Sequence, residues 1–288
     1  MSESMSGAAN EAGIVRRPTR RPASGTRRAV PALVIVPALL GGALLVLPLI
    51  ALLSRMDWAA LPATLAAPET GSALLLSLGT AGAATVCCVV LGVPLAVVLS
   101  RARGWWAVLL RGIVTLPLVL PPLVGGLALL SLLGRGGVLG DALADVGIRI
   151  PFTPAAVVIA QTFVSLPFLV ISVESALRTL TPAFADAAAT LGASPAATLF
   201  RVTLPLIRTG LIAGVVLCFT RALGEFGATA LFAGNAGGTT RTVPLAIYTA
   251  FNGAGVSQDT ALTLSLILIA VALASLFVVQ GRASARAM

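Results

Sequence analysis

Six long apolar runs set the main constraint on what this chain can fold into. An α-helix crosses the hydrocarbon core of a bilayer in about 20 residues, and each run is close to that length or longer. None shows the polar and apolar alternation of a membrane β-barrel. We therefore predict an all-α, polytopic membrane helical bundle with six transmembrane helices. The predicted spans are Val30–Leu53, Ala73–Leu99, Trp105–Leu133, Ala155–Val173, Leu206–Ala233 and Thr260–Val279.

The composition fits a membrane protein and argues against several kinds of chemistry. Of 288 residues, 58% are hydrophobic and only 10% are charged, too few charges to cover a soluble domain of this size. All 19 basic residues are arginine, so there is no lysine for a Walker A phosphate loop and no histidine for a zinc site or a Ser-His-Asp triad. We expect no catalysis and no cofactor or metal bound by this chain, and we interpret Cys87, Cys88 and Cys218 as small apolar fillers.

The arginines predict the orientation. Residues 1–28 are rich in Ser, Pro, Gly and Arg, so we expect a disordered basic cytoplasmic tail before a membrane domain at residues 29–288. With both termini cytoplasmic, 14 of the 19 arginines lie inside, four lie outside and Arg221 lies within a span, as the positive-inside rule requires. The net charge of +9 then needs no nucleic acid to explain it. The outer arginines are Arg55, Arg135, Arg149 and Arg241.

The outer connections, about residues 54–72, 134–154 and 234–259, are too short to hold a domain that captures a substrate. We therefore expect any high-affinity receptor to be a separate protein.

The longest inner connection, residues 174–205, reads as two short helices. Thr181 is a candidate N-cap with Pro182 at the first helical position, and Gly192 can end this helix. Ser194 and Pro195 repeat the start signal for a second helix. We expect Pro205 to mark the entry to the fifth span.

This connection resembles the EAA loop of binding-protein-dependent ABC importer permeases, in which the loop is the coupling helix that docks into a cleft on the ATPase. Asp186 stands where glutamate is usual, and Val202 where isoleucine is commoner. The alternative is an amphipathic hairpin on the membrane surface. The residues that match the family pattern, and that the resemblance implies as the ATPase-coupling loop, are Asp186, Ala187, Ala188, Gly192, Leu204 and Pro205.

The fifth span carries two ionisable residues. Arg221 lies roughly 20 Å into the membrane, counting about 1.5 Å per residue from Leu206, and Glu225 follows at i+4, where the two can form an ion pair. Such groups face a bundle interior, a partner or a water-filled path. Either a structural ion pair or a residue pair lining the translocation path fits the pattern. The candidate path residues are Arg221, Gly224, Glu225, Gly227 and Thr229.

Four further stretches are similar to the permease subunit of molybdate ABC importers, and the similarity covers most of residues 70–280. Sulfate and thiosulfate permeases more often carry a GEYGS-like segment where this chain has Gly224 to Ala228, and they lack the PLAIY-like stretch at Pro244 to Tyr248. The resemblance implies a permease for molybdate and tungstate, with sulfate or thiosulfate as the alternative. The stretches are Thr115–Gly137, Gln161–Val170, Leu223–Asn235 and Val243–Ala250.

The resemblance also implies an assembly in a bacterial cell membrane, surrounded by lipid and with a type I ABC importer fold. We expect a homodimer of permeases, two cytoplasmic ABC ATPase subunits that hold ATP and Mg, and an extracytoplasmic molybdate-binding protein. A channel would need a pore filter or charge ring. A secondary transporter would need coupling carboxylates, and Glu225 is the only clear acidic group within the predicted spans.

Overall fold

The computed structural model describes residues 32–253 and 258–284, and these residues form helices joined by turns. The chain divides into two compact units, Met1–Ile50 and Ala51–Met288. In the first unit the described residues lie in α1 (Ala32–Ser54), which runs on into the second unit. The other helices are α2 (Leu61–Ala66), α3 (Pro68–Arg101), α4 (Gly104–Val119), α5 (Pro122–Leu133), α6 (Gly140–Asp145), α7 (Pro154–Arg178), α8 (Ala183–Thr190), α9 (Pro195–Thr198), the π-helical turn η1 (Leu199–Thr203), α10 (Leu204–Leu206), α11 (Arg208–Leu223), α12 (Gly227–Phe232), α13 (Val243–Phe251) and α14 (Gln258–Ser284).

The core of the second unit is formed by α3, α7 and α11, which pack against one another. Small residues allow this close approach, as is common between membrane helices. A Cβ added at Gly210 of α11 would lie 2.5 Å from the Cβ of Ala176 on α7, and Ser172 Oγ donates a hydrogen bond to the Gly210 carbonyl at 2.9 Å. Cys88 and Cys218 are buried in this core as free thiols, which agrees with their interpretation as apolar fillers.

Membrane-length helices confirm the predicted fold class. By length and hydropathy α1, α3 and α7 can each cross a membrane, and two bent helix pairs raise the number to five within the described residues. The sixth predicted span lies in α14, whose apolar part, Asp259–Ser275, is shorter than a crossing as far as it is described. The count of six therefore remains a prediction.

Pro117, Pro121 and Pro122 in the third predicted span predict that it is kinked or broken, and the structure confirms a break. α4 ends at Val119 and α5 begins at Pro122, with a bend of 114° between them. Proline restricts the residue before it to extended conformations, and Pro121 at ψ 135° accordingly leaves the helix. Pro117 is tolerated inside α4, so the pair Pro121–Pro122 sets the break.

The fifth predicted span is not one helix. The helical run Pro195–Leu206 bends by 78° into α11, and a second break separates α11 from α12 at residues 224–226. Pro205 lies inside this run, and the bend into α11 falls two residues later, at Ile207. The π-helical turn before it, in which Leu204 N donates to Leu199 O, loosens the backbone where a proline cannot donate.

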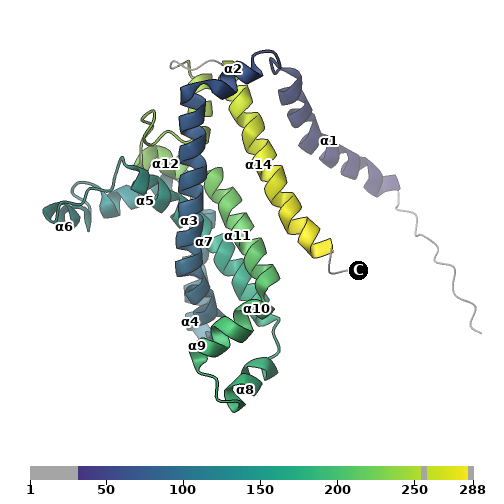
Figure 1. Ribbon diagram of the computed structural model, residues 1–288, viewed down its shortest axis with the longest axis vertical. Coiled ribbons are helices and arrows are strands. Elements are labelled where there is room, and N and C mark those ends of the chain that lie inside the picture. Colours follow the sequence, from purple (N-terminus) through teal and green to yellow (C-terminus); the bar gives the residue numbers. More distant parts are fainter. Residues whose placement is uncertain (1–31, 254–257, 285–288) are drawn as a thin grey trace, which may run out of the picture. The chain divides into compact units, whose positions relative to one another are not determined.

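The predicted coupling loop, residues 174–205, and the α5–α6–α12 group lie at different levels of the second unit. Figure 1 shows α8 and α9 at one end, beside α10 and near the start of α4, whereas α5, α6 and α12 lie away from them. α5 contacts both α6 and α12. Within the predicted outer connection, α13 is a helix that the sequence analysis did not anticipate; its first backbone N–H, at Val243, donates to Ser77 Oγ of α3 at 2.7 Å.

Candidate functional site

Arg221 and Glu225 form the predicted ion pair. Arg221 Nη1 lies 2.6 Å from Glu225 Oε2, and the two side chains are 29% and 1% exposed. A carboxylate this deeply buried needs a charged or hydrogen-bonding partner. The guanidinium is the more accessible member of the pair.

Glu225 also starts the next helix, which the sequence analysis missed. α11 ends at Leu223, and Glu225 lies in the break that follows. Its Oε1 accepts a hydrogen bond from Ala228 N at 2.8 Å, in the first turn of α12, where a negative charge stabilises the exposed N–H groups. The two carboxylate oxygens thus have separate partners, one on each helix.

The glycines of this segment differ in what surrounds them. A Cβ at Gly227 would lie 2.5 Å from Pro122 Cβ on α5, and one at Gly126 on α5 would lie 2.8 Å from the Ala228 carbonyl oxygen. Gly227 therefore permits the close α5–α12 contact. Gly224 has only Thr220 O nearby, at 3.6 Å, so it makes no such contact here.

Three buried polar side chains near this break have no hydrogen-bond partner within the described residues: Thr229 on α12, and Gln161 and Ser165 on α7. Gln161 and Ser165 share the helical face of Ser172, which contacts α11. Val158, on that same face, packs against the buried cluster of Ala81, Ala84, Ala222 and Leu223, which includes the end of α11 just after Arg221. An amide inside an apolar span is the signal that could have added Gln161 to the candidates.

The first helix of the predicted coupling loop, α8, ends at a turn formed by a glycine. α8 contains Asp186, Ala187 and Ala188 and is followed by Gly192 at φ +81°. Gly192 N donates to Ala189 O at 2.9 Å and Ala193 N to Ala188 O at 3.0 Å, which is the Schellman arrangement that favours glycine at this position. Gly192 therefore makes the predicted turn.

Of the two helix starts predicted in the loop, the first is wrong and the second is confirmed. The predicted Thr181 N-cap is wrong, because α8 begins one residue later with Pro182 at the cap position and no side-chain hydrogen bond there. Ser194 does cap α9, accepting from Ala197 N at 3.2 Å, with Pro195 at the first helical position. At the far end of the loop, Leu204 packs against the α3–α7–α11 core, whereas Pro205 is exposed.

The coupling loop exposes large apolar side chains that the sequence analysis did not single out. No residue of α8 is buried. Phe184 and Phe200 are more than half exposed, and Leu191 is 88% exposed. Exposed apolar groups clustered on one short hairpin are typical of a protein interface, and aromatic residues outside any predicted span were the signal for them.

An ion-pair cluster joins the end of α7 to α4. Glu174 Oε1 lies 2.9 Å from Arg111 Nε and 3.0 Å from Arg178 Nε, and Arg111 Nη2 also donates to Leu99 O near the end of α3 at 3.4 Å. Glu174 is largely buried. α7 continues to Arg178, so this cluster lies on the last turn of α7, shortly before α8. Across the described ranges, no group of three or more Cys, Asp or Glu side chains could hold a metal ion.

Comparisons with known proteins identify the family. The family described as "Binding-protein-dependent transport system inner membrane component" matches residues 88–288. The molybdenum transport system permease protein ModB of Mycobacterium tuberculosis is 51% identical over 243 residues, which cover 84% of this chain and 91% of that protein. The sulfate transport system permease protein CysT of Escherichia coli is 38% identical over 208 residues, which cover 71% and 75%. A crystal structure of a bacterial ABC transporter for alginate import matches with a TM-score of 0.63 at 17% identity, covering 86% of this chain and 94% of that one. This last likeness supports the fold alone.

Proposed function

Because this chain belongs to the family of binding-protein-dependent transport system inner membrane components, we propose that it is the permease subunit of an ATP-driven importer for molybdate and tungstate. The observation that best supports molybdate as the substrate is the 51% identity to ModB over most of both chains. Tungstate has nearly the size and charge of molybdate, so a path for one serves the other. Within this family the chain is a transmembrane component rather than the catalytic one.

Sulfate is the second candidate substrate. The CysT sulfate permease shares 38% identity over 71% of this chain, and sulfate is also a tetrahedral dianion. The lower identity favours molybdate, and the two candidates differ in which labelled ion the cell takes up.

In the proposed mechanism, the coupling loop transmits the movements of the ATPase. Phe184, Leu191 and Phe200 are exposed and would bury their apolar surface in a cleft on the ATPase. The Schellman turn at Gly192 fixes the angle between the two loop helices. We propose that Asp186, Ala187 and Ala188 lie at this contact and that Leu204 and Pro205 lead from it back to the bundle. ATP and Mg are held by the ATPase.

We propose that Arg221 and Glu225, with Gly224, Gly227 and Thr229, line the translocation path. The guanidinium is a planar fork that suits an oxyanion, and its partial exposure allows an anion to replace Glu225 Oε2. Glu225 Oε1 would still hold the N-terminus of α12 through Ala228 N. The exchange would therefore leave α12 anchored. A purely structural ion pair is the alternative, and the two differ in whether loss of Arg221 prevents assembly.

The proposed assembly contains two copies of this chain, two ATPase subunits and an extracytoplasmic molybdate-binding protein in a bacterial inner membrane. Both termini would be cytoplasmic, which follows from the arginine distribution. The tail at residues 1–28 lies outside the described residues.

The test is uptake of labelled molybdate at nanomolar concentration by cells with and without this gene, challenged separately with excess tungstate and excess sulfate. We expect uptake that requires the gene and that tungstate suppresses but sulfate does not. Equal competition by sulfate, or gene-dependent uptake of labelled sulfate, would move the assignment to the sulfate permeases. Uptake that continues after removal of the ATPase would overturn the ATP-driven mechanism itself.

A further inference from the structure

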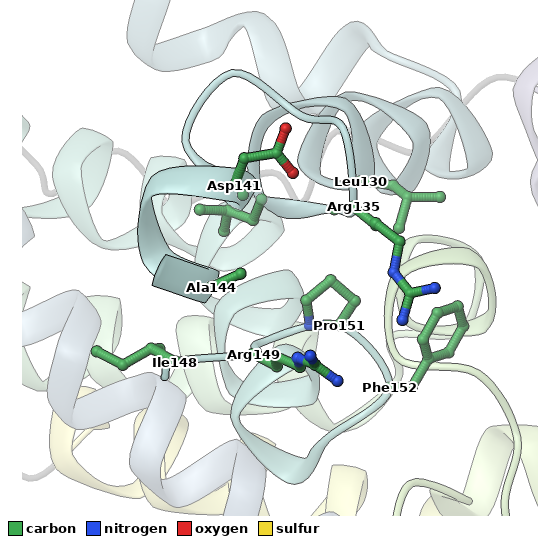
Figure 2. Close-up of a pocket in the computed structure, with 11 residues that line it drawn as sticks. Leu130, Arg135, Asp141, Ala144, Ile148, Arg149, Pro151 and Phe152 are labelled. Atoms are coloured by element: carbon green, nitrogen blue, oxygen red, sulfur yellow. The ribbon is translucent and has the colours of Figure 1, made fainter. Parts of the chain in front are cut away.

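A pocket of about 370 Å³ lies between the end of α5, α6 and the segment that leads into α7. Figure 2 shows the side chains of Arg135, Arg149 and Phe152 projecting into the same space. Asp141 also lines it, and its Oδ1 accepts a hydrogen bond from Gly136 N at 2.9 Å. In Figure 2 the Asp141 carboxylate points away from the two guanidinium groups.

Both arginines of the pocket are free to bind a partner. Neither takes part in an ion pair or a hydrogen bond with any described residue. Arg241, another of the predicted outer arginines, is engaged: its Nε donates to Asn235 Oδ1 at 3.0 Å and its Nη2 to the Asn235 carbonyl at 3.3 Å. Arginines are thus few on the predicted outer side, and two of its four line one pocket in which Asp141 is the one acidic lining residue.

Phe152 is held in the pocket by a strained backbone. It has φ +61°, the only positive φ of a non-glycine residue among those described, and a bulky side chain in this region is a marked outlier. Phe152 N donates to Phe232 O at the end of α12 at 3.2 Å, which fixes the residue beside α12. The ring nevertheless remains 64% exposed. Strain that keeps an aromatic ring at the surface marks functional sites more often than packing sites.

Apolar side chains surround the basic pocket. Ile148, beside Arg149 in the sequence, lines it, and both Ile148 and Val146 are exposed. Arginine and aromatic residues are enriched at binding sites between proteins, and the exposed aliphatic side chains add apolar surface beside them. A single five-atom oxyanion would fill only part of a pocket of about 370 Å³, and an acidic side chain alone is no larger. A protein loop that carries an acidic side chain would fill more of the pocket and also cover its apolar rim.

We propose that this pocket is a docking site for the extracytoplasmic binding protein, which inserts an acidic side chain between Arg135 and Arg149 and packs against Phe152. The inference rests on the proposed function. The pocket lies in the predicted outer connection 134–154, and Figure 1 shows α5 and α6 away from the coupling loop that would face the ATPase. Two guanidinium groups that line one pocket would attract a carboxylate during the approach of the binding protein and fix the orientation of the bound protein.

The test measures binding of the molybdate-loaded binding protein to the intact permease–ATPase complex in lipid nanodiscs. Arg135→Glu and Arg149→Glu are compared with Arg55→Glu, which makes the same charge change at an exposed outer arginine outside the pocket. We expect the Kd to rise at least about tenfold for each pocket variant and to stay within twofold for Arg55→Glu. The association rate of the pocket variants should also depend less steeply on salt. Complex yield and basal ATPase activity should be unchanged.

Each other outcome overturns the proposal. If both pocket variants bind the binding protein with the Kd of the wild type, the pocket is not the docking site. Binding of labelled molybdate to the complex without the binding protein, lost in Arg149→Glu while docking is unchanged, would make the pocket an oxyanion site. Failure of the two permease copies to assemble in the variants would make it a permease–permease contact. If wild-type complex does not bind the binding protein at all, the proposed function fails instead.

Discussion

Arg111 and Glu174 are 63 residues apart in the chain, and their side chains meet at 2.9 Å. Because Glu174 also binds Arg178 one turn later and Arg111 reaches the Leu99 carbonyl, one carboxylate ties α4 and the end of α3 to the part of α7 that leads into α8. Ion pairs therefore hold together the helix ends from which the predicted coupling loop begins.

Replacing Glu174 with Gln should weaken the attachment of the end of α7 to α4 and α3. The side chain keeps an acceptor oxygen but loses its charge, and unmatched partly buried polar groups cost about 1–3 kcal/mol. We expect the complex to unfold several degrees lower, and transport per ATP hydrolysed to fall because the coupling loop moves independently of α7. Differential scanning fluorimetry and coupled transport assays measure the two effects. Glu69→Gln, at an exposed glutamate at the start of α3, is the control, and an equal effect there would show that the cluster does not matter.

Replacing Arg221 with Ala should reduce molybdate uptake at least tenfold while the complex can still be purified. Lys at this position keeps the charge but not the planar fork, so Arg221→Lys should restore uptake only in part. Arg208→Ala changes an exposed arginine at the start of α11 and should transport normally. A complex that no longer assembles when Arg221 is lost would favour the structural ion pair instead.

Gly192→Pro should abolish coupling without preventing membrane insertion. Proline fixes φ near about −65°, whereas Gly192 has φ +81° and donates its N–H to Ala189 O. The turn cannot form, so transport and copurification of the ATPase should both be lost. Gly238→Pro has the same conflict at φ +75° in the predicted outer connection and should leave copurification of the ATPase intact. Normal transport by the Gly192 variant would refute the role of the loop.

Gly126→Ala should destabilise the α5–α12 contact, because the new Cβ would lie 2.8 Å from the Ala228 carbonyl oxygen. Overpacking of this kind costs about 1–3 kcal/mol. Gly82→Ala, where no atom lies within 4 Å of the added Cβ, should leave the melting temperature unchanged or raise it. The comparison is a thermal melt of the two purified variants, and equal melting temperatures would mean that α5 and α12 separate readily.

What the sequence predicted well depends on local chemistry. Hydrophobic length marks α3 and α7, the pair Pro121–Pro122 breaks the third span, and Gly192 and Ser194 form the turn and the cap that their residue types favour. These features need only neighbouring residues, so a pattern along the chain is enough to find them.

What the sequence did not predict depends on contacts between distant segments. The 114° bend accompanies the packing of α5 on α12, about 100 residues further along. The pairing of Glu174 with Arg111 and the backbone strain at Phe152 likewise require the folded arrangement. The second role of Glu225 was hidden for a different reason: a continuous helix through residue 225 leaves no N-terminus to cap, and the break appears only in the structure.

The exposed Phe184, Leu191 and Phe200 of the coupling loop also bear on how much of this protein a cell can keep. In the proposed assembly, a copy without its ATPase would present three large apolar side chains to the cytoplasm, and exposed apolar surface of this kind is what chaperones and proteases act upon. Surplus copies would be removed, and the stoichiometry of the importer would then be set by degradation of the unmatched subunit rather than by equal synthesis.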